Sequence, residues 1–116
     1  MKYLFILNDP PYGSERSYNA LRLATSLAKA EGSKVSVFLI GDAATAAVAG
    51  QATPQGYYNM ERMLKLLDGK GAALGVCGSC MDARGITEDE LTEGCHRSSM
   101  DELTDWTQQA HRVLVF

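Results

Sequence analysis

Two cysteines separated by two residues carry the most distinctive chemistry in this sequence. Cys77 and Cys80 lie in residues 75–85, which read GVCGSCMDARG. Cys77 falls where a predicted strand ends, and a helix that begins near Ser79 would place free backbone N–H groups beside its sulfur. This position favours the thiolate, which is the form that attacks sulfur or binds a metal ion. If the chain folds back, Arg84 adds positive charge, so Cys77 is a candidate sulfur nucleophile.

The same spacing has three other interpretations. C-x-x-C occurs in thioredoxin-type dithiols, although there it opens a long helix after an early strand, and here it comes late. The pair could supply half of a four-ligand zinc site, for which Cys95, His96 and His111 are the other candidate ligands. Alternatively, both cysteines are small buried packing residues, a common fate for cysteine. The spacing alone does not choose between a reactive and a structural pair. For Cys95, in a short predicted strand, packing is the expectation.

Three further polar side chains are expected near the same end of the molecule. Tyr12 and Glu15 follow the first predicted strand, and Asp42 follows the second. Tyr12 and Glu15 either line a pocket around Cys77 or serve the turn and the helix dipole. Helix capping accounts for Asp42 by itself. The first loop lacks the Gly-Lys-Ser/Thr ending of a phosphate-binding loop, so no nucleotide site is predicted.

The elements that must position these residues alternate between strand and helix. Short apolar runs predict strands, and apolar residues at helical spacing predict helices. The expected strands are 2–7, 35–40, 72–77, 93–97 and 113–116, and the expected helices are 14–31, 42–50, 57–68, 79–84 and 99–110, with Ser14, Asp42 and Ser99 as N-caps. Such alternation indicates parallel strand pairing with helices on both faces of the sheet. Ligand sites in such sheets lie beyond the carboxyl ends of the strands, where the loops 8–14, 41–42 and 77–84 are expected to meet.

Length and composition restrict the class of protein. The 116 residues are expected to form one domain, 1–116, with an ordinary globular share of 46% apolar residues. Eleven basic against fourteen acidic residues give a net charge of −3, which argues against nucleic acid as the main partner. Three cysteines are too few for a secreted disulfide framework, so we expect reduced thiols and a cytoplasmic protein. No apolar run reaches the ~20 residues of a membrane span, and no signal peptide is predicted.

Segments along almost the whole chain resemble the DsrE/DsrF-like sulfur-relay family, and most closely its branch of small YchN-type proteins. Collinear matches over this length are more specific than any single motif. The matching residues are Asn8, Pro11–Glu15, Asn19–Ala24, Phe38–Leu39, Asp42–Ala43, Gly50–Gln51, Gly56–Tyr57, Met63–Leu64, Cys77, Cys80, Asp82, Arg84–Gly85, Glu102–Leu103, Trp106–Thr107, Val113–Leu114 and Phe116.

The resemblance implies a fold, an assembly and a reaction. Members of the family have α/β/α layers, so the fold expected here is a three-layer α/β/α sandwich with a mainly parallel five-stranded sheet. They form oligomers, often hexamers, and a homo-oligomer, most simply a hexamer, is expected. In the relay members a cysteine of this loop accepts sulfur as a persulfide from a donor protein and passes it to an acceptor protein. Exchange between thiols needs no metal ion and no organic cofactor.

By its position before the Arg84-Gly85 pair, the carrier cysteine of the family corresponds to Cys77. The supporting residues are expected to be Cys80, Arg84, Tyr12, Glu15 and Asp42. Cys80 is a feature of the YchN-type branch and is not general to the relay members, which leaves a dithiol role open. Two other functions remain: an oligomeric module that binds a small anion or a partner protein, and a redox protein with a reversible Cys77–Cys80 disulfide.

Overall fold

A parallel β-sheet forms the centre of the molecule, which the computed structural model describes over residues 1–116. Every neighbouring pair of strands is parallel, and the spatial order is β4-β3-β2-β1-β5. The strands are β1 (Lys2–Leu7), β2 (Lys34–Leu39), β3 (Ala73–Cys77), β4 (Cys95–Ser98) and β5 (Arg112–Val115).

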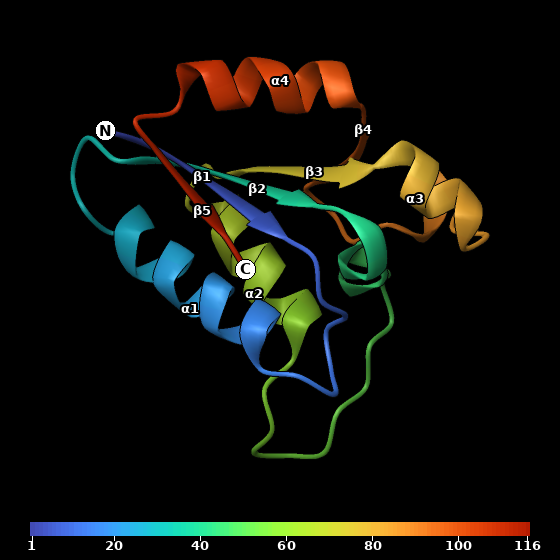
Figure 1. Ribbon diagram of the computed structural model, residues 1–116. Coiled ribbons are helices and arrows are strands. Elements are labelled where there is room, and N and C mark those ends of the chain that lie inside the picture. The colour runs from blue at the N-terminus through green and yellow to red at the C-terminus, as the bar shows by residue number, and fades with distance from the viewer.

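Helices cover both faces of this sheet. They are α1 (Arg16–Ala28), α2 (Met60–Gly69), α3 (Gly78–Ala83) and α4 (Met100–Gln109), with two 3-10 helices, η1 (Gly41–Ala47) and η2 (Glu88–Glu90). In Figure 1, α1 and α2 lie on one face and α4 lies on the other. The predicted three-layer α/β/α sandwich with a five-stranded parallel sheet is therefore confirmed. None of these helices combines the length and the apolar character that crossing a membrane requires.

Capping side chains set where two of the helices begin. Asn59 Oδ1 accepts the Arg62 N–H at 3.1 Å, so α2 starts at Met60 and not at the predicted residue 57. Ser99 Oγ accepts the Glu102 N–H at 3.3 Å, which confirms the predicted start of α4. Both caps satisfy backbone N–H groups that have no partner within the helix.

The predicted bounds of α1 are wrong at both ends. Glu15, rather than Ser14, is the N-cap, although the Ser14 hydroxyl accepts the Arg16 N–H at 3.2 Å while it donates to Asp9 Oδ2 at 2.7 Å. At the other end α1 stops at Ala28 instead of residue 31. Beyond it the chain tightens into turns before Gly32, whose φ of +79° ends the helical path.

Residues 41–47 form the 3-10 helix η1 and not the predicted α-helix. Its N-cap is Ile40, and the prediction that Asp42 caps the segment is wrong. Gly41 has a φ of +59°, so the chain turns sharply as β2 ends and Asp42 already lies in the first turn. The Asp42 side chain is thereby left free for another partner.

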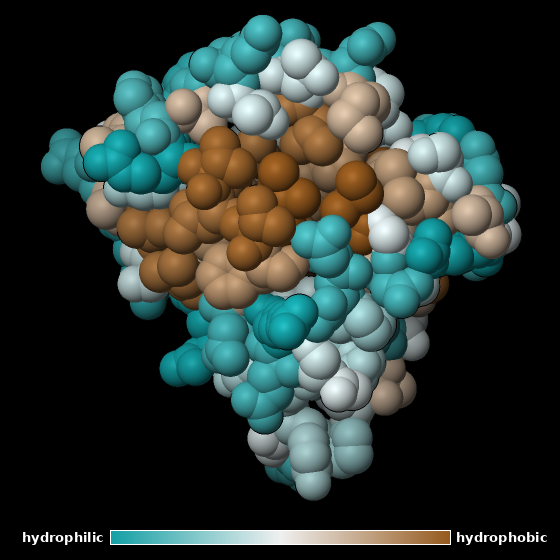
Figure 2. Space-filling view, in the orientation of Figure 1, coloured by the Kyte–Doolittle hydropathy of each residue, from teal (hydrophilic) through white to brown (hydrophobic).

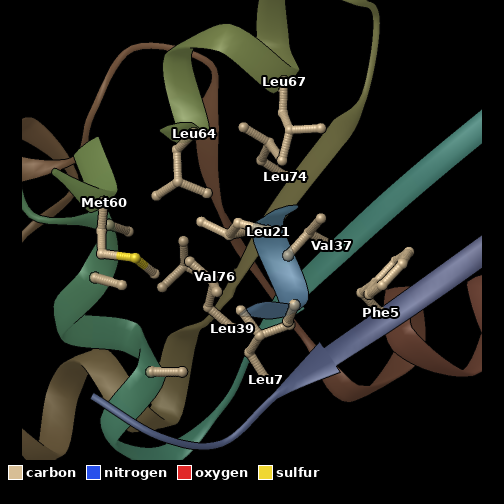
Figure 3. Close-up of a cluster of buried hydrophobic side chains, with 14 of the residues drawn as sticks. Phe5, Leu7, Leu21, Val37, Leu39, Met60, Leu64, Leu67, Leu74 and Val76 are labelled. Atoms are coloured by element: carbon tan, nitrogen blue, oxygen red, sulfur yellow. The ribbon is translucent and has the colours of Figure 1, made fainter. Parts of the chain in front are cut away.

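Apolar side chains fill both sides of the sheet. Successive residues of a strand point to opposite faces, so Leu4 and Phe5 of β1 enter different clusters. The smaller cluster, under α4, consists of Leu4, Phe38, Cys77 and Leu103. The larger cluster lies between the sheet and α1 and α2, and its large members in Figure 3 are Phe5, Leu7, Leu21, Val37, Leu39, Met60, Leu64, Leu67, Leu74 and Val76.

Gly75 of β3 lets α4 approach the sheet closely. A Cβ at this position would lie 3.1 Å from Trp106 Cη2 and 3.3 Å from Phe38 Cδ2. Trp106 packs edge-on against Phe38, with ring centroids 6.2 Å apart. The glycine that weakens the strand pattern in the sequence is therefore required by close packing against α4. Cys77, two residues further along β3, belongs to this same face.

Candidate functional site

Cys77 is the last residue of β3 and the N-cap of α3. Its Sγ accepts the Cys80 N–H at 3.4 Å and lies 3.4 Å from Ser79 Oγ. Burial by itself would raise the pKa of the Cys77 thiol, but hydrogen bonds from Cys80 and Ser79 outweigh it and the pKa is lowered. Because these groups stabilise the negative sulfur, Cys77 is the better thiolate of the pair.

Cys80 has the opposite character. Its Sγ accepts the Gly41 N–H at 3.1 Å, so the turn after β2 contributes to the site. Burial, followed by the hydrogen bond with Cys77, raises the pKa of the Cys80 thiol despite the Gly41 N–H and the charge of Arg84. The two cysteines are thus chemically distinct, because the pKa of Cys77 is lowered and that of Cys80 is raised.

Arg84 lies on the Cys80 side of the site. Its guanidinium donates to Asp42 Oδ1 at 2.7 Å and to the Cys80 carbonyl oxygen at 3.0 Å. The structure therefore brings together Arg84, Asp42 and Cys80, three of the residues singled out from the sequence. The Arg84–Asp42 pair links the end of α3 to η1. The side chain of Asp42 has this role in place of the helix cap that its position suggested.

Arg97 is a charged neighbour of Cys77 that sequence reasoning missed. Its Nη1 and Nη2 donate to the two carboxylate oxygens of Asp82 at 2.8 and 2.9 Å. A Cβ at Gly78 would lie 3.0 Å from Arg97 Cζ, so the guanidinium lies directly against the first residue of α3. Hydrogen bonds to Asp82, and to a smaller extent the charge of Cys77, raise the pKa of Arg97. No spacing in the sequence indicates this contact, because β4 comes next to Cys77 only through its pairing with β3 in the sheet.

A hydrogen-bonded group on the other side of Cys77 joins β4 to α4. Ser98 lies opposite Cys77 in the strand register, and its hydroxyl donates to Glu102 Oε1 at 2.5 Å. His96 Nε2 bonds to the same carboxylate oxygen. Burial would raise the pKa of Glu102, but the bonds to Ser98 and His96 prevail and lower it. This group holds α4 over the face to which Cys77 belongs.

The contacts of Tyr12 lie in the loop that precedes α2. Its hydroxyl donates to Gln51 Oε1 at 2.6 Å and accepts the Met60 N–H at 3.2 Å. Its ring stacks on Tyr58, with centroids 5.6 Å apart. Glu15 is exposed, and its side chain makes no capping hydrogen bond. Neither side chain makes a hydrogen bond to Cys77, and Tyr12 instead holds residues 51–60 against the core.

Cys95 is separated from the pair. It lies opposite Leu74 in the strand register, whereas Cys77 lies opposite Ser98. Burial, with a smaller contribution from Asp68, raises the pKa of Cys95 to about 12. The His, Cys, Asp and Glu side chains form no group of three or more that could hold a metal ion, so Cys95, His96 and His111 do not complete a zinc site with the pair.

Access to Cys77 is restricted in the single chain. Only 7% of the residue is exposed, and Leu4, Phe38 and Leu103 pack around it. The two cavities of the molecule, of about 150 and 400 Å³, lie elsewhere, and Lys34 and Ser36 at the start of β2 line both. Cys77 is therefore largely shielded from solvent in the single chain.

Comparison with known proteins places this arrangement in a family. The sequence profile of the DsrE/DsrF-like family matches residues 1–116. Protein YchN of Escherichia coli (strain K12) is 38% identical over 116 residues, which cover 99% of this chain and 98% of YchN. Uncharacterized protein MJ0989 of Methanocaldococcus jannaschii is 36% identical over 116 residues, covering 100% of both chains.

Two solved structures share the fold. The crystal structure of YchN from E. coli has a TM-score of 0.88 at 36% identity, and the alignment covers 99% of this chain and 98% of that one. MTH1491 of Methanobacterium thermoautotrophicum, a protein of unknown function, has a TM-score of 0.78 over the same shares of the two chains. At 14% identity the second likeness concerns the fold alone.

Proposed function

The chain belongs to the DsrE/DsrF-like family, and on that premise we propose that it is a sulfur carrier that holds a persulfide on Cys77. The family is linked to sulfur relay in general. The donor and the acceptor of the sulfur are other proteins with reactive thiols. We place the reaction in the cytoplasm, where cysteine thiols remain reduced.

The chemistry is an exchange between thiols. The Cys77 thiolate attacks the outer sulfur of a donor persulfide, the S–S bond of the donor breaks, and the donor thiolate leaves. Cys77 then carries the outer sulfur as its own persulfide, and the thiolate of an acceptor protein attacks that sulfur in the second step. Each step breaks one S–S bond and forms another, so no electron is gained or lost overall.

The observation that carries this proposal is the difference in pKa between the Cys77 and Cys80 thiols. Hydrogen bonds from Ser79 and Cys80 lower the pKa of Cys77 although the residue is buried. A buried thiol without such hydrogen bonds has a raised pKa, as Cys95 does. Arg97 adds positive charge next to the start of α3, and this charge supports a thiolate or a persulfide anion at Cys77.

The restricted access to Cys77 fits a reaction between docked proteins. A partner that displaces Leu103 or the end of α3 would bring its own thiol to the sulfur and exclude water at the same time. In this way the carried sulfur is protected between loading and delivery. The proposal therefore assigns donor and acceptor proteins, rather than free small molecules, as the partners of Cys77.

An exposed apolar surface on β5 supports self-association, and we propose that the protein is a homo-oligomer, most simply a hexamer as is frequent in this family. Val113 and Val115 of this edge strand are 43% and 66% exposed. Figure 2 shows an apolar patch over the part of the face where β5 lies in Figure 1. An edge strand with an apolar surface is a preferred site for pairing with another chain. Val115→Glu should lower the mass measured by sedimentation equilibrium, whereas an unchanged mass would argue against this surface.

Mass spectrometry after incubation with a cysteine desulfurase and cysteine tests the carrier function. The expected product is the intact protein with one added sulfur on Cys77, removable by a reducing agent. Cys77→Ser should stay unloaded, and Cys95→Ser should load as the unaltered protein does. If Cys77 gains no sulfur while a known carrier is loaded in parallel, the proposal fails. Retention of partner binding by Cys77→Ser would then favour a binding module instead.

A further inference from the structure

Cys77 is the N-cap of α3 and Cys80 lies in the first turn of this helix, and each sulfur accepts a backbone N–H. The Cys80 N–H donates to Cys77 Sγ at 3.4 Å, and the Gly41 N–H donates to Cys80 Sγ at 3.1 Å. Residues three apart in a helix have Cβ atoms about 5–6 Å apart. A disulfide needs Cβ atoms about 3.5–4.5 Å apart, so an approach of the two Cβ atoms by about 0.5–2.5 Å would allow the bond to form.

The third cysteine is not placed to take part. Cys95 lies three residues away from Ser98, the residue opposite Cys77 in the strand register. Three residues along a strand correspond to about 10 Å and to opposite faces of the sheet. Disulfide-bonded residues have Cα atoms within about 7 Å of each other. Cys80 is therefore the cysteine of this chain that can react with Cys77.

We propose that Cys80 discharges the persulfide that the proposed function assigns to Cys77, so that the protein releases hydrosulfide when no acceptor takes the sulfur. The inference rests on that proposed function. The Cys80 thiolate attacks Cys77 Sγ, which is the inner sulfur of the persulfide. The bond between Cys77 Sγ and the outer sulfur breaks, and a bond between the two cysteine sulfurs forms. The outer sulfur leaves with the electron pair of the broken bond as hydrosulfide.

Atoms and electrons balance in this step without a further reactant. The outer sulfur gains two electrons and is reduced from sulfane sulfur to sulfide. The two cysteine sulfurs lose two electrons and become a disulfide, and the proton of the Cys80 thiol passes to the outer sulfur of the persulfide anion, which leaves as hydrosulfide. A dithiol reductant, either a small molecule or a protein, must reduce the Cys77–Cys80 disulfide before the next cycle.

The local geometry favours attack on the inner sulfur. Cys77 Sγ is fixed by the Cys80 N–H and lies beside Ser79, both in the turn that carries Cys80. An outer sulfur would stand one S–S bond, about 2 Å, farther from the atoms that hold Cys77 Sγ. Reaction between groups held in one turn also has a high effective concentration. Cys80 therefore competes well with free thiols once the Cys77 persulfide has formed.

The test compares the lifetime of the persulfide in matched variants of the full chain. Reduced protein is loaded by a cysteine desulfurase with cysteine as the sulfur source and is then separated rapidly from both. Released sulfide is then followed by fluorescent derivatisation, and the protein is followed by intact mass under non-reducing conditions. Cys80→Ser keeps an oxygen that can accept the Gly41 N–H. Cys95→Ser removes a thiol outside the site, and Cys77→Ser gives the background.

The unaltered protein should lose the added sulfur, release one sulfide per persulfide and end with the mass of an internal disulfide. Cys80→Ser should keep the added sulfur longer by about tenfold or more, because the intramolecular nucleophile is absent. Cys95→Ser should behave as the unaltered protein does. Equal lifetimes in the unaltered protein and in Cys80→Ser, or sulfide release without a disulfide, would overturn the inference and leave the carrier function standing. Failure of both proteins to load Cys77 would refute the carrier function itself.

Discussion

Replacing Gly78 with alanine tests the packing that brings Arg97 to the start of α3. A Cβ at this position would lie 2.9 Å from the Ser98 carbonyl oxygen and 3.0 Å from Arg97 Cζ and Nε. Non-bonded heavy atoms are at their optimum at about 3.5–4.0 Å. The Gly78→Ala protein must therefore move β4 away from α3 by about 0.5 Å or more, or swing the guanidinium outward.

The expected loss of stability is the difference between two effects. Overpacking of this kind costs about 1–3 kcal/mol. Alanine is favoured over glycine in a helix by about 0.5–1 kcal/mol. We expect Gly78→Ala to lower the free energy of unfolding by about 0.5–2 kcal/mol. For a chain of this size the melting temperature should fall by about 2–8 °C. Displacement of Arg97 should also raise the pKa of Cys77, because a positive charge moves away from the thiolate.

Thermal unfolding followed by circular dichroism measures the first effect, and the pH dependence of iodoacetamide alkylation at Cys77 measures the second. Gly69→Ala is the matched control, since this helical glycine has no heavy atom within 4 Å of an added Cβ. It should gain up to about 0.5–1 kcal/mol and leave the pKa of Cys77 unchanged. If Gly78→Ala is as stable as the unaltered protein, the close packing of β4 on α3 is wrong. The proposed effect of Arg97 on the pKa of Cys77 would then have no structural basis.

Three further predictions concern other parts of the molecule. Alkylation of the native protein should modify Cys77 at a lower pH than an ordinary thiol, because the pKa of Cys77 is lowered. Cys95, whose pKa is raised to about 12, should react only after unfolding. Peptide mass mapping gives the order in which the two cysteines are modified. The lowered pKa of Glu102 contributes stability above the pKa of its unfolded state, and this contribution is lost as the pH falls through the folded value. Glu102→Gln should therefore flatten the acid limb of a stability–pH curve, and an unchanged limb would contradict the hydrogen bonds described for this carboxylate. Tyr12→Phe should lower the free energy of unfolding by about 1–2 kcal/mol, since two hydrogen-bond partners lose the hydroxyl, without changing the loading of Cys77 with sulfur. A loading defect in a stably folded Tyr12→Phe protein would instead place this side chain in the reaction.

Much of the fold could be predicted from the sequence because it depends on neighbours along the chain. The apolar runs of β1, β2 and β3 and the capping pattern at Ser99 determine local structure, and the alternation of strand and helix indicates parallel pairing. From this alone Cys77 could be placed at the end of β3 and at the beginning of a short helix. The errors are of two kinds: shifted helix ends, as at Ser14, and the 3-10 geometry after Gly41.

The partners of each side chain could not be predicted in the same way. Arg84 is close to Cys77 in the sequence, yet its guanidinium donates a hydrogen bond to Asp42 on the Cys80 side of the site. Arg97 is 20 residues from Cys77 (97 − 77), yet the β3–β4 register brings it to Asp82 and the first turn of α3. Tyr12 has the residue type and position of a pocket residue, but two hydrogen bonds direct it to the loop before α2.

By itself, the sequence determined most of the strands and helices, their parallel pairing and a cysteine pair at the carboxyl edge of the sheet, because periodicity, caps and turns act over a few residues. The tertiary structure alone decided that the two thiols differ, that Arg97 lies against Gly78 while Arg84 pairs with Asp42, and that Leu103 of α4 packs with Cys77. These properties arise from burial and from hydrogen bonds between segments far apart in the chain. They exist only when the strand register and the packing of α4 have brought those segments together.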